Sequence, residues 1–356
     1  MYNTGMTTKQ SLKQIYSKNF FIFLGVGFLP LVWKILEIAL LSGFDNAINI
    51  LGQLALINII FKVFEETLLN PLYKTLSKNN FKTDEQKNAV AKKFLWVYIF
   101  ITFAFTVLVF LLNRVIAKIS CVPNDIFDKV IVFFNIYIFA CGFGFIAKFL
   151  YTFNIINKDT KKMFIYFISK AFGTALLLLV FVPKFSLALG VNGVAIAELI
   201  VNVVTTCYLL ITFPKTQKQQ IDFDKQNYLK LTAFSFLETI IRNVVYYCVI
   251  LVVINMLNNQ DLYYVSNDYI WSFMLVPTLA QSTLVRQDIA SNPSKPLKAY
   301  FINCLILLAF MGILTPFAMV VFKYIYALPN YLEYFYVLLK LLPFYIIFVF
   351  DSVIES

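Results

Sequence analysis

The sequence predicts an all-α protein that crosses a membrane many times, and three observations carry this prediction. Hydrophobic residues make up 60% of the 356 residues and charged residues only 14%, whereas about a quarter of a soluble protein is charged. Apolar runs as long as the ~20 residues that a spanning helix needs follow one another along the chain. Similar features also recur at an offset of 206 residues, which indicates a duplicated architecture. A soluble fold of this size could not bury so much apolar surface.

Ten membrane spans can be placed, all of them too long for the strands of a membrane barrel. Several exceed the length of a straight spanning helix, so we expect tilted or kinked helices. The predicted spans are 20–41, 48–72, 94–113, 126–153, 163–182, 191–213, 229–256, 263–284, 300–322 and 334–355.

The loops between these spans alternate in charge. The N-terminal tail and the even-numbered loops carry 19 basic residues, and the odd-numbered loops carry 5. Because positive loops stay in the cytoplasm, the N-terminus is predicted to be cytoplasmic and the protein to lie in a cytoplasmic membrane, such as a bacterial inner membrane. These loops also account for the net charge of +11, so no nucleic-acid partner is expected.

An internal repeat relates the two halves of the chain. At an offset of 206 residues, Pro71 falls on Pro277 and the segment 122–124 falls on 328–330. Six spans per repeat is an even number, so both halves share one orientation in the membrane. We therefore expect twelve spans in two parallel six-helix lobes, with the last two spans following the end of this chain. The predicted lobes are 1–213 and 229–356, joined by a cytoplasmic linker over 214–228.

Charged residues within the spans are the candidate functional groups, because each would be costly facing lipid. Three acid–base pairs have the spacing of neighbours on one helix face, so local neutralisation is an alternative to function; they are Lys34–Glu37, Lys62–Glu66 and Glu238–Arg242. Asp351, Glu198 and Asp268 lack such a partner. A carboxylate of this kind can bind a proton, Na⁺ or an organic cation, and the alternative is an ion pair with a lysine of another helix. Lys148 and Lys170 lie near predicted span ends, where we expect them to snorkel.

Other residue types narrow the function further. Prolines inside spans predict kinks, of which Pro30, Pro71 and Pro277 are the strongest candidates. The chain has no histidine, and its five cysteines are scattered and never form a CxxC pair, so no metal centre or cofactor is expected. Neither a Walker A loop nor a nucleophile elbow occurs, and the protein is predicted not to be an enzyme.

Three segments resemble motifs of the multidrug and toxic compound extrusion (MATE) transporters, a family of the MOP flippase superfamily. Residues 189–197, LGVNGVAIA, are similar to the family's lG-x-x-GaAiAt pattern at the start of span six. Pro30, Glu37 and Gly43 resemble its P…D-x-x-x-x-G pattern in span one. Residues 348–353, FVFDSV, resemble its f-x-x-D-a-x stretch, which places Asp351 on the cation-site aspartate of the NorM-like branch.

Two departures from the family pattern concern the ion site. The acid of span one is Glu37 and not aspartate, and its spacing from Pro30 is shorter than usual. The glutamate of span seven in the NorM-like branch falls on Asn243, while Glu238 lies a turn or more earlier. The details of a Na⁺ site at Asp351 therefore stay open.

The resemblance implies a MATE-like two-lobe helix bundle that works as a monomeric secondary antiporter for multidrug efflux. It would export small organic cations, xenobiotics or similar amphiphiles across the lipid bilayer in exchange for H⁺ or Na⁺. The implied ion and substrate residues are Glu37, Asp351, Asn243, Glu238 and Asp268. Two alternatives stay open: a flippase for lipid-linked oligosaccharides of the same superfamily, and an inactive truncated transporter.

Overall fold

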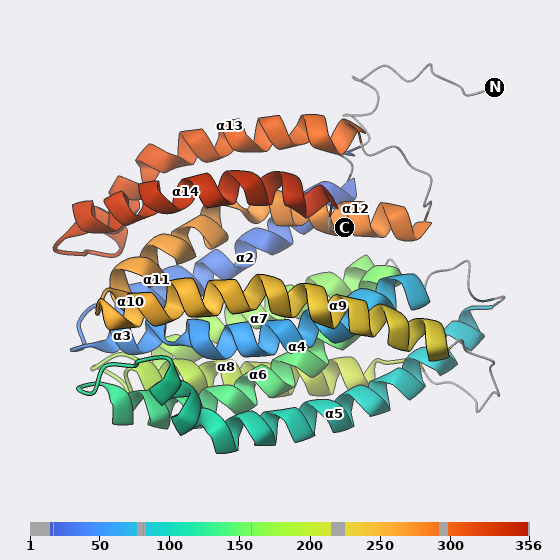
Figure 1. Ribbon diagram of the computed structural model, residues 1–356, viewed down its shortest axis with the longest axis horizontal. Helices are drawn as coiled ribbons and strands as arrows, with labels where there is room; N and C mark the ends of the chain where they lie inside the picture. The colour runs from blue at the N-terminus through green and yellow to red at the C-terminus, as the bar shows by residue number, and fades with distance from the viewer. Residues whose placement is uncertain are drawn as a thin grey trace. The chain divides into compact units, whose positions relative to one another are not determined.

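The computed structural model describes residues 15–16, 18–76, 81, 83–157, 159–214, 225–291 and 298–354. Over these residues the chain is helical and forms no strand, which confirms the all-α class (Figure 1). Its long helical segments correspond one to one to the ten predicted spans. Seven helices in this part of the chain are long and apolar enough to cross a membrane, namely those over 47–72, 84–119, 127–156, 161–181, 191–211, 298–325 and 331–354. The protein is therefore a multi-pass membrane protein.

The helices group into two compact units. Unit 1 comprises Met1–Ser42 and Leu262–Ser356, and unit 2 comprises Gly43–Asp261. This grouping places the first span with the last three, and the seventh span with the second to sixth. The lobes expected from the repeat, 1–213 and 229–356 with a linker over 214–228, follow a different division and stay a prediction.

Unit 2 is a bundle in which α6 packs against α5 and α8, and α4 packs against α9. The large side chains of α4, α5 and α6 fill its interior, with Phe145 and Tyr98 stacked at 5.8 Å between ring centroids. The elements of unit 2 are α3 (Ala47–Gly52), α4 (Leu54–Thr75), α5 (Asp84–Ile119), α6 (Phe127–Ile156), α7 (Thr160–Phe181), α8 (Val191–Ile211), α9 (Lys225–Val245), the π-helix η2 (Tyr246–Val252) and α10 (Val253–Met256).

Helix α5 begins earlier than the sequence pattern predicts. Its predicted span starts at residue 94, whereas the helix starts at Asp84, inside a stretch that reads as a polar loop. The Thr83 side chain caps the helix by accepting a hydrogen bond from the Gln86 backbone N–H at 3.3 Å, and Asp84 and Glu85 lie in the first turn. An N-cap threonine followed by acidic residues favours a helix start, so local capping extends the helix beyond its apolar part.

The glycines before and within α8 have distinct structural reasons. Gly190 has φ of +54°, a left-handed conformation that favours glycine, directly before the helix starts. A Cβ atom at Gly193 would lie 2.9 Å from the backbone carbonyl of Phe181, the last residue of α7. The motif at residues 189–197 therefore sets the turn between α7 and α8 and allows the two helices to approach closely.

We expect Gly193→Ala to destabilise the protein, whereas Gly25→Ala should be neutral or stabilising. The added methyl at Gly193 would force the α7 backbone away, and overpacking of this kind costs about 1–3 kcal/mol. Gly25 lies within a helix, and nothing lies within 4 Å of the place that a Cβ atom would take, so alanine there only improves helix propensity. Thermal unfolding of both variants in detergent measures the difference. Equal unfolding temperatures would contradict the close contact.

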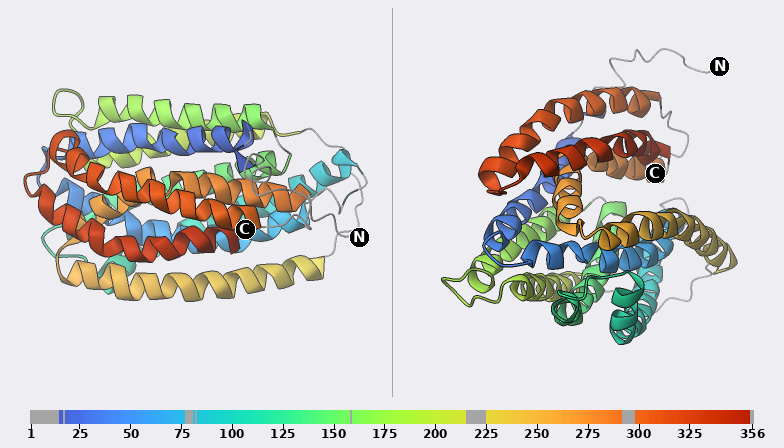
Figure 2. Two further views of the ribbon diagram at one scale, coloured as in Figure 1. Left: turned by 90° about the horizontal axis from the view of Figure 1, so that it is seen from above. Right: turned by 60° about the vertical axis from the view of Figure 1, so that its left-hand side comes forward.

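The described residues of unit 1 form four helical segments. Helix α2 packs against α12, where Gly27 faces the side chain of Val276, and α13 and α14 lie side by side (Figure 2). The elements of unit 1 are α2 (Lys18–Leu41), α11 (Gln260–Tyr269), whose first two residues belong to unit 2, η3 (Ile270–Met274), α12 (Val276–Ser291), α13 (Lys298–Val320), η4 (Val321–Ile325) and α14 (Tyr331–Ile354).

The predicted proline kinks take different forms. Pro71 lies inside an uninterrupted α4, and Pro30 lies within α2. Pro277 follows the π-helical turn η3, which is closed by a hydrogen bond of 2.9 Å from the Leu275 N–H to the Ile270 carbonyl. Proline cannot donate a backbone hydrogen bond, and a π-turn is one way for a helix to adjust its backbone near such a residue. In the eighth span the irregular turn therefore lies directly before the proline, whereas the second span is interrupted at Gln53, well before Pro71.

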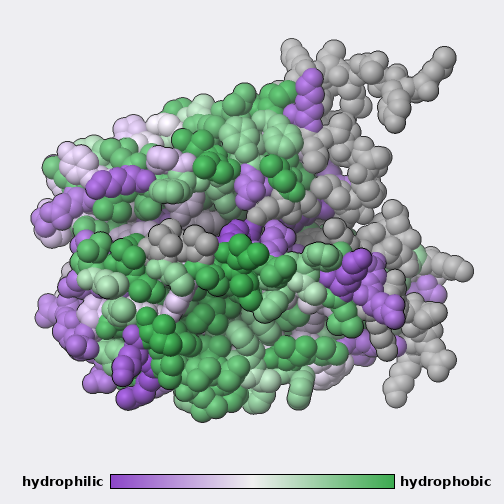
Figure 3. Space-filling model, viewed as in Figure 1, coloured by the Kyte–Doolittle hydropathy of each residue, from purple (hydrophilic) through white to green (hydrophobic). Residues whose placement is uncertain are grey.

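The surface of unit 2 fits a lipid environment. On the face shown in Figure 3, hydrophobic side chains cover the middle of its helices and hydrophilic ones gather toward the ends. Helix α5 contributes large exposed residues to its apolar surface, among them Trp96, Phe100, Phe103 and Leu111. Such a continuous apolar surface is expected only where lipid or a partner covers it.

Candidate functional site

A cluster of polar side chains lies inside unit 1, between α2 and α11. Glu37 is 1% exposed, and the Lys34 Nζ lies 3.0 Å from its Oε2. The same Lys34 Nζ donates a hydrogen bond of 3.1 Å to the Tyr264 hydroxyl on α11. Lys34 and Glu37 are three residues apart, which places both side chains on one face of α2. This ion pair confirms the local pair expected from the sequence.

Asp268 brings a second carboxylate into this cluster. It lies one turn after Tyr264 on α11, and Lys34 is close enough to interact with it electrostatically. Its Oδ2 is buried and has no hydrogen-bond partner among the described residues, and the same holds for the hydroxyl of the fully buried Tyr326. Tyr326 is close enough to Asp268, Lys34 and Glu37 to interact with them electrostatically. We call Lys34, Glu37, Tyr264, Asp268 and Tyr326 the α2–α11 cluster.

The charges of the α2–α11 cluster do not balance. Two carboxylates share one ammonium group, so the cluster has a net charge of −1 when all three groups are ionised. Burying an uncompensated charge is unfavourable, and a bound cation or proton removes the imbalance. Carboxylate and hydroxyl oxygens are also ligands that a hard cation prefers.

Neighbouring aromatic residues hold α11 and η3 in place. The Trp271 Nε1 donates a hydrogen bond of 2.9 Å to the Tyr345 hydroxyl on α14, which in turn donates to the Asn267 Oδ1 next to Asp268. Trp271 also packs edge-on against Phe348. Trp271 belongs to the π-helical turn η3, and π-turns are frequent at functional sites.

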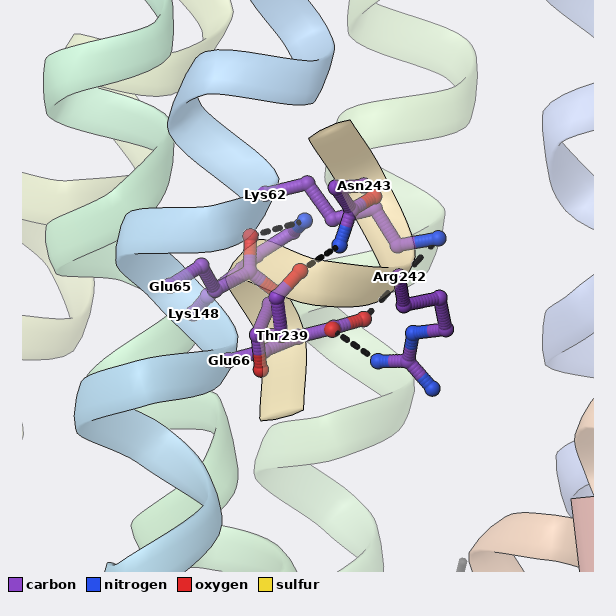
Figure 4. A network of polar contacts seen from close by, with 7 residues as sticks. All are labelled: Lys62, Glu65, Glu66, Lys148, Thr239, Arg242 and Asn243. Atoms are coloured by element: carbon purple, nitrogen blue, oxygen red, sulfur yellow. Dashed lines mark hydrogen bonds and ion pairs between the residues drawn. The ribbon is translucent and has the colours of Figure 1, made fainter. Parts of the chain in front are cut away.

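A second polar cluster lies inside unit 2 and joins α4, α6 and α9 (Figure 4). Glu66 pairs with both Lys62, at 3.9 Å, and Arg242 of α9, while Glu65 accepts a hydrogen bond of 2.6 Å from Lys148 of α6. We call these five residues the α4–α6–α9 network. The Asn243 Nδ2 lies beside it and donates to the Thr239 carbonyl at 2.8 Å.

The network corrects one sequence expectation and adds one contact. Arg242 pairs with Glu66 of a neighbouring helix and not with Glu238, which lies on an exposed part of α9. Lys148 forms an ion pair with Glu65 of α4, while its expected snorkelling stays a prediction. The expected Lys62–Glu66 pair is present, although it is long.

The predicted site residues fall in different places. Glu37 and Asp268 lie together in unit 1, whereas Asn243 is buried in unit 2 and Glu238 is exposed there. Asp351 is half-buried near the C-terminal end of α14 and forms no ion pair within the described ranges. Glu37 lies near the C-terminal end of α2, and these two helix ends point to opposite sides of unit 1 (Figure 1). The structure therefore joins Glu37 with Asp268 and not with Asp351.

Sequence reasoning missed the tyrosines of the α2–α11 cluster and the Glu65–Lys148 pair. Tyr264 and Asp268 have the four-residue spacing of one helix face, which could have suggested a shared site. No sequence signal connects Tyr326 or Lys148 to its neighbours, because these contacts form between helices that are far apart in the chain.

Helices that bury charged side chains among apolar ones define a polytopic membrane protein with a polar interior. No protein-family model matches the sequence, and no curated protein matches it. Two solved structures are similar to the chain.

Both structures are of the Vibrio cholerae MATE transporter VcmN. An aspartate-to-asparagine mutant of that transporter gives a TM-score of 0.68 at 15% identity and covers 98% of this chain and 84% of that chain. The same transporter in the bent form gives a TM-score of 0.56 at 14% identity and covers 89% of this chain and 75% of that chain. The chain therefore has the fold of MATE transporters, as the resemblance of its motifs predicted.

Proposed function

We propose that this chain is a secondary active transporter that exports an organic cation or a similar amphiphile in exchange for H⁺ or Na⁺. The observation that carries the proposal is the α2–α11 cluster, in which the buried carboxylate of Glu37 and the half-buried carboxylate of Asp268 share one lysine. The likeness of the fold to a MATE transporter supports the transport class.

The cluster suits an exchange of cations. In the proposed cycle, Glu37 and Asp268 bind either the coupling ion or the cationic group of the substrate, because the net charge of −1 is balanced by one positive charge. Lys34 keeps Glu37 in position through the ion pair of 3.0 Å. Competition for one site couples the two movements when the site opens to one side of the membrane at a time.

The buried oxygens do not distinguish between the two ions. Asp268 Oδ2 and the Tyr326 hydroxyl are unpartnered within the described part of the chain and could complete a Na⁺ shell together with Glu37 and Tyr264. A proton would instead neutralise one carboxylate. Asp351 stays a second predicted carboxylate, and Asn243 and Glu238 stay secondary candidates.

The loop charges set the proposed orientation, and the resemblance to MATE transporters suggests the assembly. Its N-terminus lies in the cytoplasm, it spans the cytoplasmic membrane, and it works as a monomer without a cofactor other than the coupling ion. No enzymatic step is part of the proposal, since the energy comes from the ion gradient.

Proteoliposomes test this proposal directly. The purified 356-residue chain is reconstituted with a panel of fluorescent organic cations, and a pH or Na⁺ gradient is applied in separate experiments. Dye movement should follow one of the gradients, stop when an ionophore dissipates it, and be absent from protein-free liposomes. Gradient-driven export would be refuted if dye movement depended on neither gradient, or if no dye moved at all.

A further inference from the structure

The α4–α6–α9 network has the opposite charge imbalance to the α2–α11 cluster. It contains three bases, Lys62, Lys148 and Arg242, and two carboxylates, Glu65 and Glu66. When all are ionised, this set of described residues has a net charge of +1. Glu65 pairs with Lys148, while Glu66 is shared between Lys62 and Arg242.

The three bases remain accessible even though they lie in spans. Their side chains are 45% (Lys62), 48% (Lys148) and 37% (Arg242) exposed, although each pairs with a carboxylate. Charged groups that face lipid are strongly unfavourable, so an exposed ion-pair network inside spans is expected to face water or a bound ligand.

The network is also held in place by several helices. Its members come from α4, α6 and α9, and Ser235 of α9 donates a further hydrogen bond of 3.1 Å to the Glu66 carbonyl. Ion pairs that already hold the long basic side chains in place reduce the conformational entropy that is lost when a ligand binds. Arginine adds a planar donor fork that matches carboxylate and phosphate oxygens.

We infer that the α4–α6–α9 network binds an anionic group, a phosphate or a carboxylate, of the transported substrate. Lys62 is the base to test, because its distance of 3.9 Å to Glu66 is the longest ion-pair distance of the network. The inference rests on the proposed transport function and narrows its substrate to amphiphiles that carry an acidic group.

Anion-dependent stabilisation tests the inference without any transport. Unfolding temperatures of the detergent-purified chain are recorded against inorganic phosphate, pyrophosphate and citrate, with sodium chloride at equal ionic strength as reference. A ligand that binds the folded state raises the unfolding temperature in proportion to its affinity. We expect at least one of these anions to stabilise the wild type beyond chloride, and Lys62→Gln to weaken its apparent affinity about tenfold or more, as for loss of one charged contact.

A matched lysine variant controls for net charge. Lys340 lies in the middle of α14, is exposed and belongs to unit 1, so Lys340→Gln removes the same charge from another span. This variant should bind the anions like the wild type, and Lys62→Arg should restore most of the affinity. Equal anion affinities of Lys62→Gln, Lys340→Gln and wild type would overturn the inference.

A second series identifies the source of the anionic group. The chain is placed in nanodiscs of phosphatidylglycerol or of phosphatidylcholine, and the unfolding temperatures of the wild type and Lys62→Gln are compared. A stabilisation by phosphatidylglycerol that requires Lys62 assigns the site to a lipid headgroup, and stabilisation by soluble anions alone assigns it to a free acid or phosphate. If neither series shows a stabilisation that depends on Lys62, the site is refuted. If the stabilisation is present but no dye is exported, only the proposed cation exchange is refuted.

Discussion

Glu37→Gln is expected to reduce gradient-driven export to the level of protein-free liposomes. Glutamine keeps the shape of the side chain but can neither bind a proton at neutral pH nor balance a cation. Glu37 is 1% exposed and lies 3.0 Å from Lys34, so its replacement leaves Asp268 as the remaining carboxylate of the cluster that interacts with that ammonium. The remaining pair is neutral, which removes the net charge that would attract a cation.

The same change should leave the protein folded. Loss of a charged hydrogen bond costs about 1.5–3 kcal/mol, and the neighbouring Asp268 compensates part of the charge left on Lys34. Unfolding in detergent should therefore show a moderate decrease in stability together with complete loss of transport.

Three carboxylate variants separate this site from a general effect of charge. Asp268→Asn should reduce export like Glu37→Gln, because both acids share Lys34. Glu333→Gln, an exposed position in the first turn of α14, should export like the wild type. Asp351→Asn tests the second predicted carboxylate independently. Normal export by Glu37→Gln in the same liposomes would exclude the α2–α11 cluster as the exchange site.

The sequence predicted the helices well because apolar length is a local property. Every predicted span corresponds to a helical segment, and the ends differ mainly where capping or a π-turn intervenes. The start of α5 at Asp84 depends on the Thr83 cap, which a hydropathy pattern does not register. The interruption at Ile270–Met274 likewise depends on backbone hydrogen bonds and not on apolarity.

The candidate sites were predicted only in part, because ion pairs between helices depend on packing. Spacing along one helix found Lys34–Glu37 and Lys62–Glu66, since three or four residues always place two side chains on one face. It failed for Glu238–Arg242 because Glu66 of a neighbouring helix is the closer partner. The pairing of Glu37 with Asp268 required knowledge that α2 and α11 meet, which no single-sequence pattern contains.

A buried pair of amides in unit 2 leads to the second large expected effect. The Gln53 Nε2 donates to the Asn255 Oδ1 at 2.9 Å, and the Asn255 Nδ2 donates back to the Gln53 Oε1 at 3.1 Å and to the Ser120 carbonyl at 2.8 Å. Gln53 is 0% and Asn255 3% exposed. The pair thereby joins the start of α4 to the end of α10, two elements that the repeat assigns to different lobes.

Asn255→Leu is expected to destabilise the protein by about 2–5 kcal/mol. Loss of the Asn255 amide leaves the Gln53 amide and the Ser120 carbonyl buried without the partners seen in the structure. Each buried polar group without a partner costs about 1–3 kcal/mol. Chemical unfolding in detergent measures the change. Thr232→Val on α9, whose hydroxyl donates a hydrogen bond of 2.9 Å to the Tyr228 carbonyl one turn earlier, serves as a polar-to-apolar control.

The double variant Gln53→Leu/Asn255→Leu distinguishes direct pairing from two separate effects. Each single variant leaves one amide without its partner, whereas the double variant removes both amides together. The double variant should therefore be less destabilised than the sum of the single ones, by a coupling of about 0.5–3 kcal/mol. Additive effects would contradict the reciprocal hydrogen bonds. If the coupling is present and the lobes move as the repeat predicts, opening between α4 and α10 must break this pair, so its strength limits how readily the transporter opens at that end.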